Sequence, residues 1–351
     1  MTRLALIFSM LFSFLAVSAP ISVGAAEGGR PAIKKSIQKA QKLKVKARKK
    51  FNAVNKKRIK TRANPQRIIR TIRSSDDYQA QHNSSGAEQS VFSSPGTSGL
   101  HLASSKALIV NQSTGETLYA KSTNTPTPIA SITKLMTAMV MLDLHLPMDE
   151  MLTVSEADVD TLKNTTSRLR VGTTLSRREM LQLALMSSEN RAASVLARTT
   201  PIGLPAFVAA MNRKALELGM ANSRFADPTG LNSDNVSTAE DLVKMVKAAY
   251  QYDEIRQNST AQSHQVPVAG LRNPVEFRNT NVLVRNGTWD IGLSKTGYIS
   301  EAGRCLVMQA QIAQQPLIIV LLDSYGKLSR IGDAQRIRKW IESSGATQRR
   351  A

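Results

Sequence analysis

The sequence predicts an α+β protein in which strands from both ends of one domain form an antiparallel sheet around a helical middle. Apolar, β-branched runs bounded by turn residues occur soon after residue 105 and again after residue 290. Between about residues 154 and 251, apolar residues recur instead with helical spacing. Strands at the two ends with helices between them are best satisfied by one sheet that packs against helices.

The first predicted strands form a hairpin. Lys106–Asn111 and Thr117–Ala120 flank the turn residues Ser113–Glu116. A Pro-containing segment then leads to Ser131, which opens an apolar helix that continues through Leu142. Because this helix is apolar nearly all round, we expect it to be buried.

The remaining elements follow in order. Helices are predicted over Arg177–Met186, Arg191–Arg198, Pro205–Leu218 and Ser237–Tyr250, with a turn at Asp227–Leu231. Strands are predicted over Asp290–Lys295, Gly303–Ile312 and Pro316–Leu322, and a closing helix over Arg330–Ile341.

Residues 1–26 have the pattern of a secretory signal peptide. Arg3 precedes an apolar run from Leu4 to Val17, and small residues close the segment at Gly24–Ala26. A retained N-terminal anchor is the alternative, since the run comes close to spanning length. No second run of roughly 18 apolar residues follows. We therefore expect an exported protein that is soluble or associated with a surface.

Most of the net charge of +21 belongs to one segment. Residues 27–73 hold 18 Lys and Arg against a single acid, Glu27, so the rest of the chain is nearly neutral. Apolar residues from Ile33 to Val54 form one stripe at helical spacing, which fits a cationic amphipathic helix. A self-repelling, solvated tail is the alternative. Residues 30–73 could bind an anionic envelope surface, and the export signal argues against nucleic acid as a physiological partner.

Residues 74–100 are rich in Ser, Gly, Gln and Asn and read as a linker, which places the folded domain at residues 101–345 and a short tail at 346–351. Cys305 is the only cysteine, so no intramolecular disulfide can form, and its apolar surroundings favour a buried structural thiol. With four scattered histidines, no metal site and no cofactor are expected.

Three short motifs carry the predicted chemistry. They are Ser131-Ile-Thr-Lys134, Ser188-Glu-Asn190 and Lys295-Thr296-Gly297, separated by 57 and 107 residues. A helix places Ser131 and Lys134 about one turn apart on one face. A neutral lysine amine can take the proton of a serine nucleophile if burial or a second cation, for which Lys295 is a candidate, lowers its pKa.

The other motif residues complete a site for acyl transfer. Ser188 can relay a proton, and the Asn190 amide can bond a substrate carbonyl and hold Lys134. We expect Lys295–Gly297 to end an edge strand, where Gly297 lets a peptide substrate pair as an added strand and Lys295 and Thr296 meet a carboxylate. The backbone N–H groups of Ser131 and Tyr298 are the predicted oxyanion donors.

Together the motifs resemble the serine D,D-peptidases of the low-molecular-mass penicillin-binding protein family, over residues 101–345. Asp227-Pro-Thr-Gly-Leu231 and Ala302-Gly-Arg-Cys-Leu306 resemble further signatures of that family. The resemblance implies a β-lactamase/transpeptidase-like fold, with an antiparallel sheet flanked by helices and a helical subdomain. It also implies that Arg330 meets the terminal carboxylate of the substrate.

Within that family the chain is most similar to the small periplasmic D-alanyl-D-alanine endopeptidases, which implies peptidoglycan stem peptides as substrates and β-lactam antibiotics as inhibitors. Ser187-Ser-Glu-Asn-Arg191 departs from the form usual in carboxypeptidases, and little sequence follows the closing helix. A D-alanyl-D-alanine carboxypeptidase is the nearest alternative.

The sequence argues against three other functions. A β-lactamase needs a carboxylate that activates water, whereas the matching region offers only Asp227, which lies within a turn. A non-catalytic wall-binding protein would leave three intact motifs unused. A Ser-His-Asp hydrolase would need a Gly-x-Ser-x-Gly turn, which the sequence lacks.

Overall fold

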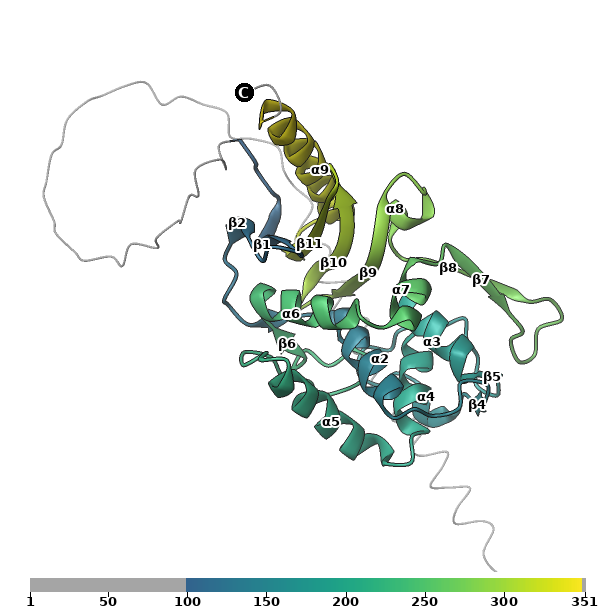
Figure 1. Cartoon of the computed structure of the whole chain (residues 1–351). Helices are drawn as coiled ribbons and strands as arrows, with labels where there is room; N and C mark the ends of the chain where they lie inside the picture. The colour runs from purple at the N-terminus through teal and green to yellow at the C-terminus, as the bar shows by residue number, and fades with distance from the viewer. Residues whose placement is uncertain (1–98, 349–351) are drawn as a thin grey trace, which may run out of the picture. The chain divides into compact units, whose positions relative to one another are not determined.

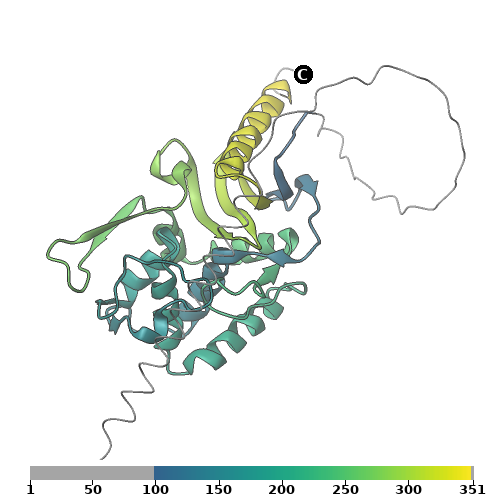
Figure 2. The same ribbon diagram turned by 180° about the vertical axis from the view of Figure 1, so that it is seen from behind.

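The computed structural model describes residues 99–348. The predicted signal peptide, the basic segment, residues 74–98 of the linker and the last three residues of the tail lie outside the described residues. Figures 1 and 2 show the described domain from two opposite sides.

A five-stranded antiparallel sheet forms the centre of the domain. Its strands lie in the order β2 (Thr117–Lys121), β1 (Ser104–Asn111), β11 (Gln315–Ser324), β10 (Gly303–Ile312) and β9 (Asp290–Ile299). The N-terminal β1 pairs directly with the C-terminal β11, in a register that sets Ile109 opposite Ile319. The predicted sheet built from both ends of the domain is therefore confirmed.

The central strands are buried on both faces, so they read as almost continuous apolar runs. On β11, Ile318, Val320 and Leu322 face one hydrophobic core, whereas Leu317, Ile319 and Leu321 face a second. This alternation is the period-two geometry of a strand. Cys305 on β10 is buried as predicted, and burial raises the pKa of its thiol to about 11.

Helices cover both faces of the sheet, as the predicted fold class requires. The long helix α9 (Ser329–Gln348) packs on one face through Ala334, Ile337 and Ile341. The other face packs against α6 (Ala239–Ala249) and the buried helix α2 (Lys134–Asp143). In Figures 1 and 2, α9 lies on one side of the sheet and the remaining long helices lie on the other.

The helical subdomain contains α3 (Arg177–Met186), α4 (Asn190–Arg198) and α5 (Gly203–Glu217). These helices and α6 lie where the spacing of apolar residues predicts them. Local chemistry fixes their starts: the Ser176 hydroxyl accepts from the Glu179 N–H while the Glu179 carboxylate accepts from the Ser176 N–H, a capping box at α3. Thr238 caps α6 through a single hydrogen bond, in which its hydroxyl accepts from the Asp241 N–H.

Several short elements are not predicted from the sequence. They are α7 (Asp253–Thr260), α8 (Val282–Arg285), the 3₁₀ turns η1 (Ala130–Thr133) and η2 (Glu156–Asp158), and the strand pairs β3 (Thr127–Pro128) with β6 (Val236–Ser237), β4 (Met151–Thr153) with β5 (Thr174–Ser176) and β7 (Ser263–Val266) with β8 (Val275–Arg278). Most are too short to show a hydrophobic period. The closing helix is also longer than expected, since α9 continues past Ile341 to Gln348.

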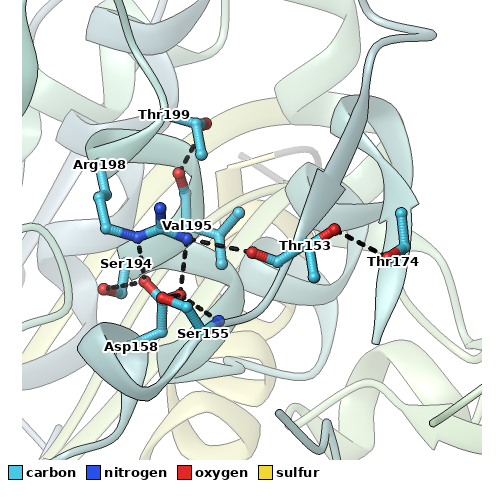
Figure 3. A network of polar contacts seen from close by, with 8 residues as sticks. All are labelled: Thr153, Ser155, Asp158, Thr174, Ser194, Val195, Arg198 and Thr199. Atoms are coloured by element: carbon cyan, nitrogen blue, oxygen red, sulfur yellow. Dashed lines mark hydrogen bonds and ion pairs between the residues drawn. The ribbon is translucent and has the colours of Figure 1, made fainter. Parts of the chain in front are cut away.

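A buried carboxylate ties η2 to the helical subdomain (Figure 3). Asp158 accepts from the Arg198 guanidinium at 3.0 and 2.8 Å and from the Ser194 hydroxyl at 2.8 Å, and both donors lie on α4. The Ser155 N–H donates to the same carboxylate. Arg198 also donates to the Thr153 carbonyl on β4, so one guanidinium joins α4 to both η2 and β4.

No single helix within residues 99–348 has the length and apolar composition of a membrane span. Helices α4 and α5 reach those criteria only as a pair bent by 100°.

Candidate active site

The site is centred on the Lys134 side chain, at the start of α2. Its Nζ lies 2.8 Å from Ser131 Oγ, 2.7 Å from Asn190 Oδ1 and 2.6 Å from the Thr229 carbonyl oxygen. Ser131 belongs to the 3₁₀ turn η1, which continues directly into α2. The predicted one-turn spacing of Ser131 and Lys134 is thus realised as a direct contact.

Burial lowers the pKa of Lys134 to about 7. The side chain is 1 % exposed, so the charged ammonium loses its hydration and the neutral amine is favoured. The carboxylates of Asp227 and Glu189 oppose this effect and raise the pKa. The balance leaves an amine that titrates close to neutral pH.

Asp227 organises the loop that supplies the third Lys134 partner. Its carboxylate accepts from the backbone N–H groups of Thr229, Gly230 and Asn232. It also accepts from the Thr229 hydroxyl and from the Asn235 amide, which completes an Asx-type turn. This arrangement fixes the Thr229 carbonyl at Lys134, a contact that no sequence motif predicts.

The second motif lies in the connection between α3 and α4. Ser188 has a φ of 62°, a left-handed conformation that is uncommon for a residue with a side chain. Its hydroxyl accepts from Lys295 Nζ at 2.8 Å. Asn190, the first residue of α4, points its Oδ1 at Lys134 while its amide donates to Thr165 Oγ1 at 3.4 Å. Asn190 therefore contacts Lys134, and its role in holding the lysine and binding a substrate carbonyl stays a prediction.

Lys295 is a second buried amine, on β9. Burial, followed by the proximity of Lys134 and then of Arg330, lowers its pKa well below the usual value for lysine. The structure therefore brings the lysines of the first and third motifs close enough for the charge of Lys134 to disfavour a charge on Lys295. Through Lys134 and Lys295, the three motifs form one polar cluster.

The third motif lies inside β9, and the prediction that it ends the strand is wrong. The strand continues to Ile299, because Cys305 and Arg304 of β10 still pair with Gly297 and Tyr298. β9 is an edge strand of the sheet, as predicted. A Cβ at Gly297 would lie 2.8 Å from the Ile129 carbonyl and 3.2 Å from the Ser131 nitrogen. The missing side chain thus lets the backbone of η1 approach β9.

The neighbours of Gly297 differ in exposure. Thr296 is buried and donates through Oγ1 to Thr280 Oγ1 at 2.7 Å. The Tyr298 side chain is 56 % exposed, and the Arg304 guanidinium lies over its ring at 4.4 Å from the centroid. The role of the Tyr298 N–H as an oxyanion donor stays a prediction.

Arg330 lies in the first turn of α9 and is buried, although arginine is rarely so. Its Nε and Nη1 atoms have no hydrogen-bond partner among residues 99–348. Burial lowers the pKa of the guanidinium, and Arg304 adds to the effect. Because Arg330 also lowers the pKa of Lys295, it belongs to the same electrostatic environment. An unpaired buried cation of this kind favours an anionic ligand.

Within the described part of the chain, no group of three or more His, Cys, Asp or Glu side chains could hold a metal ion. The site contains the hydroxyls of Ser131 and Ser188, two amines with lowered pKa values, an amide and a buried guanidinium. A serine in contact with an amine of lowered pKa, at the junction of an antiparallel sheet and a helical subdomain, defines the class of serine acyl-transfer enzymes.

Comparisons with known proteins agree with this class. The family model described as D-alanyl-D-alanine carboxypeptidase matches residues 92–326. A D-alanyl-D-alanine endopeptidase of Pseudomonas aeruginosa is 49 % identical over 70 % of this chain and 79 % of its own length. An endopeptidase of the same name from Escherichia coli is 47 % identical over 69 % of this chain and 78 % of its own length.

A solved structure shows the same fold. The crystal structure of the Streptomyces K15 DD-transpeptidase superposes with a TM-score of 0.63 at 29 % identity, and the match covers 68 % of this chain and 97 % of that one. The chain belongs to the D-alanyl-D-alanine carboxypeptidase family. It is a serine-type D-alanyl-D-alanine peptidase.

Gly230 provides a test of how the Asp227 loop supports the nucleophile. A Cβ at Gly230 would lie 2.0 Å from the Ala130 carbonyl oxygen and 2.9 Å from the Ser131 nitrogen. We expect Gly230→Ala to displace Ser131 and to lower hydrolysis of a D-alanyl-D-alanine peptide by on the order of 100-fold. Steady-state kinetics measure the loss.

Gly115→Ala is the matched control, because Gly115 also has a positive φ, yet nothing lies within 4 Å of the added methyl group. Both variants should lose about 1–2 kcal/mol of stability from the backbone conformation alone. Equal activities of the two variants would show that contact with Ala130 does not position Ser131.

Proposed function

We propose that the chain is a periplasmic serine D,D-endopeptidase that cuts D-alanyl cross-links of peptidoglycan through an acyl-enzyme and is acylated by penicillins. The observation that carries the proposal is the 2.8 Å contact between Ser131 Oγ and the Lys134 amine, whose pKa burial lowers to about 7. The two relatives named D-alanyl-D-alanine endopeptidase support the choice of substrate.

In the acylation step, Ser131 Oγ attacks the carbonyl carbon of the D-alanyl residue while its proton passes to Lys134 Nζ. The C–N bond then breaks, and the leaving amine takes a proton. Ser188, which contacts Lys295 at 2.8 Å, is the proposed relay for that proton. Water hydrolyses the resulting ester and regenerates the Ser131 hydroxyl.

The remaining site residues bind and orient the substrate in this proposal. The N–H groups of Ser131 and Tyr298 stabilise the oxyanion. Asn190 bonds a substrate carbonyl, and the substrate pairs along the free edge of β9. A carboxylate next to the scissile bond meets Lys295, Thr296 and Arg330, and the unpaired Nε and Nη1 of Arg330 support this assignment.

The described geometry favours a peptidase over a β-lactamase. Asp227, the carboxylate considered for activating water, already accepts five hydrogen bonds from its own loop. Both oxygens of this carboxylate are therefore occupied by donors of the loop and are not free to hold an attacking water. A D-alanyl-D-alanine carboxypeptidase would use the same residues, since its leaving group also carries a carboxylate.

Ser131→Ala tests the nucleophile. We expect the variant to lose both cleavage of cross-linked muropeptide dimers and covalent labelling by a fluorescent penicillin, while its thermal unfolding stays close to that of the parent. Mass spectrometry of released muropeptides and of the labelled protein measures the two activities. Ser113→Ala, in an exposed turn, is the control and should keep both. Penicillin labelling that survives in Ser131→Ala would refute the assignment.

The pH dependence of acylation tests Lys134 as the base. Only the neutral amine accepts a proton, so the second-order rate of penicillin acylation should fall as the pH drops through about 7. Glu189→Gln removes a carboxylate that raises the Lys134 pKa, so the inflection should move to lower pH. Stopped-flow or quench measurements between pH 5 and pH 9 define both profiles. A shift to higher pH in Glu189→Gln would contradict this role.

Residues 30–73 are proposed to bind an anionic envelope surface, on the strength of their charge. The mature protein should sediment with cell wall or with anionic vesicles at low salt and be released as salt screens the charges. A variant that lacks residues 27–73 should stay in the supernatant and keep its peptidase activity. Identical sedimentation of the two proteins would end this proposal.

A further inference from the structure

A short loop, here called the strap (residues 160–167), leaves η2 and runs beside the second motif. Asp160 fixes its shape by accepting from the backbone N–H groups of Leu162, Lys163 and Thr165 at 2.8, 3.0 and 2.8 Å. The Thr165 hydroxyl donates to the same carboxylate at 2.7 Å. The root of the strap is fixed as well, because η2 is tied to α4 through Asp158 (Figure 3). The strap is therefore a preorganised loop.

The inner side of the strap contacts the catalytic motif. Thr165 Oγ1 accepts from the Asn190 amide at 3.4 Å, and the Ser167 hydroxyl donates to Glu189 at 2.6 Å. Glu189 is partly buried, and burial raises its pKa. These contacts attach the strap to the wall of the site that the helical subdomain forms.

The outer side of the strap reaches the opposite wall. Lys163 forms an ion pair with Glu301, which lies in the turn between β9 and β10, four residues after Gly297. The strap thus joins Asn190 on one wall to the end of the Gly297-bearing strand on the other. The side chains of Lys163 and Glu301 are 27 % and 42 % exposed, so water and salt reach this contact. It is the weaker attachment of the two.

A substrate paired on β9 would meet this contact. β9 is an edge strand, so an added peptide strand that continues past Tyr298 runs toward Glu301. With the carboxylate beside the scissile bond at Lys295 and Thr296, the part of the substrate that continues past Tyr298 is its acyl side. That side is short in a penicillin or a short D-alanyl peptide and longer in the stem peptide of a cross-linked dimer. Only the longer substrate requires Lys163 and Glu301 to separate.

We propose that the Lys163–Glu301 ion pair is a clasp that closes the site at the end of β9 and sets the preference between short and cross-linked substrates. The inference rests on the proposed endopeptidase function. If only the open state admits a cross-linked peptide, its apparent affinity is reduced by the fraction of molecules that are open. An exposed ion pair shifts such an equilibrium by roughly 1.4- to 5-fold. Opening the clasp raises kcat/KM for the cross-linked substrate by that factor and leaves short substrates unchanged.

Charge reversal tests the clasp. The measured quantity is the ratio of kcat/KM for a cross-linked muropeptide dimer to kcat/KM for a short D-alanyl-D-alanine peptide, with penicillin acylation as a second short-substrate reference. Lys163→Glu and Glu301→Lys should each raise this ratio by roughly 1.4- to 5-fold, because each places like charges together. The double variant, which restores an ion pair in reverse, should return the ratio to the parental value.

The two single variants also separate the clasp from a direct charge effect on the substrate. They change the local charge in opposite directions, so attraction or repulsion of an anionic peptide would move the ratio up in one and down in the other. Opposite shifts, unchanged ratios or a fall in both variants would each overturn the proposal. Glu342→Gln, which breaks the exposed Arg338–Glu342 pair on α9, is the control and should leave the ratio unchanged.

The parent protein distinguishes a failure of the clasp from a failure of the proposed function. If the parent cleaves the short peptide but not the dimer, the endopeptidase assignment fails, whatever the variants do. If the parent cleaves the dimer and the reversed charges leave the ratio unchanged, only the clasp fails.

Discussion

The chemistry of the site depends on the hydrogen-bond donors and acceptors around one buried amine, that of Lys134. Lys134 contacts two carbonyl-type oxygens, of Asn190 and Thr229, and one hydroxyl, of Ser131. The carbonyls can only accept, so they take both N–H groups of a neutral amine. The lone pair is then left for the hydroxyl, which is the partner able to donate to it. An ammonium would donate to all three oxygens, so the geometry fits both protonation states. Burial lowers the pKa of Lys134 to about 7 and thereby makes the neutral state, which can deprotonate Ser131, accessible.

Close backbone approach makes this arrangement possible. The turn η1, which carries Ser131, lies between the Asp227 loop and β9, and a glycine faces it from each side. Added Cβ atoms at Gly230 and Gly297 would fall 2.0 Å from the Ala130 carbonyl and 2.8 Å from the Ile129 carbonyl. The sheet, the buried helix and the loop are thereby held within contact distance of one another. Preorganisation of this kind reduces the reorganisation needed during reaction.

The main helices and the grouping of the motif residues can be predicted from the sequence, whereas contacts made by the backbone of loops cannot. Apolar periodicity predicts α3 and α6, and residue chemistry predicts that Ser131, Lys134 and Asn190 act together. The Thr229 carbonyl could not be predicted, because any residue has one and only the Asp227 turn places it at Lys134. Gly297 was predicted to end a strand, but pairing with β10 carries β9 on to Ile299. Tertiary context decides such boundaries.

The two lysines and Arg330 have different electrostatic roles in the proposed mechanism. Burial lowers the pKa values of Lys134 and Lys295, and the proximity of Lys134 lowers that of Lys295 further, so both amines tend toward the neutral form. The pKa of Arg330 is also lowered, but a guanidinium starts so high that it stays protonated. Arg330 therefore keeps a positive charge for the substrate carboxylate when the lysines are neutral. The proposed mechanism thus assigns the permanent positive charge to Arg330 and the proton transfer to Lys134.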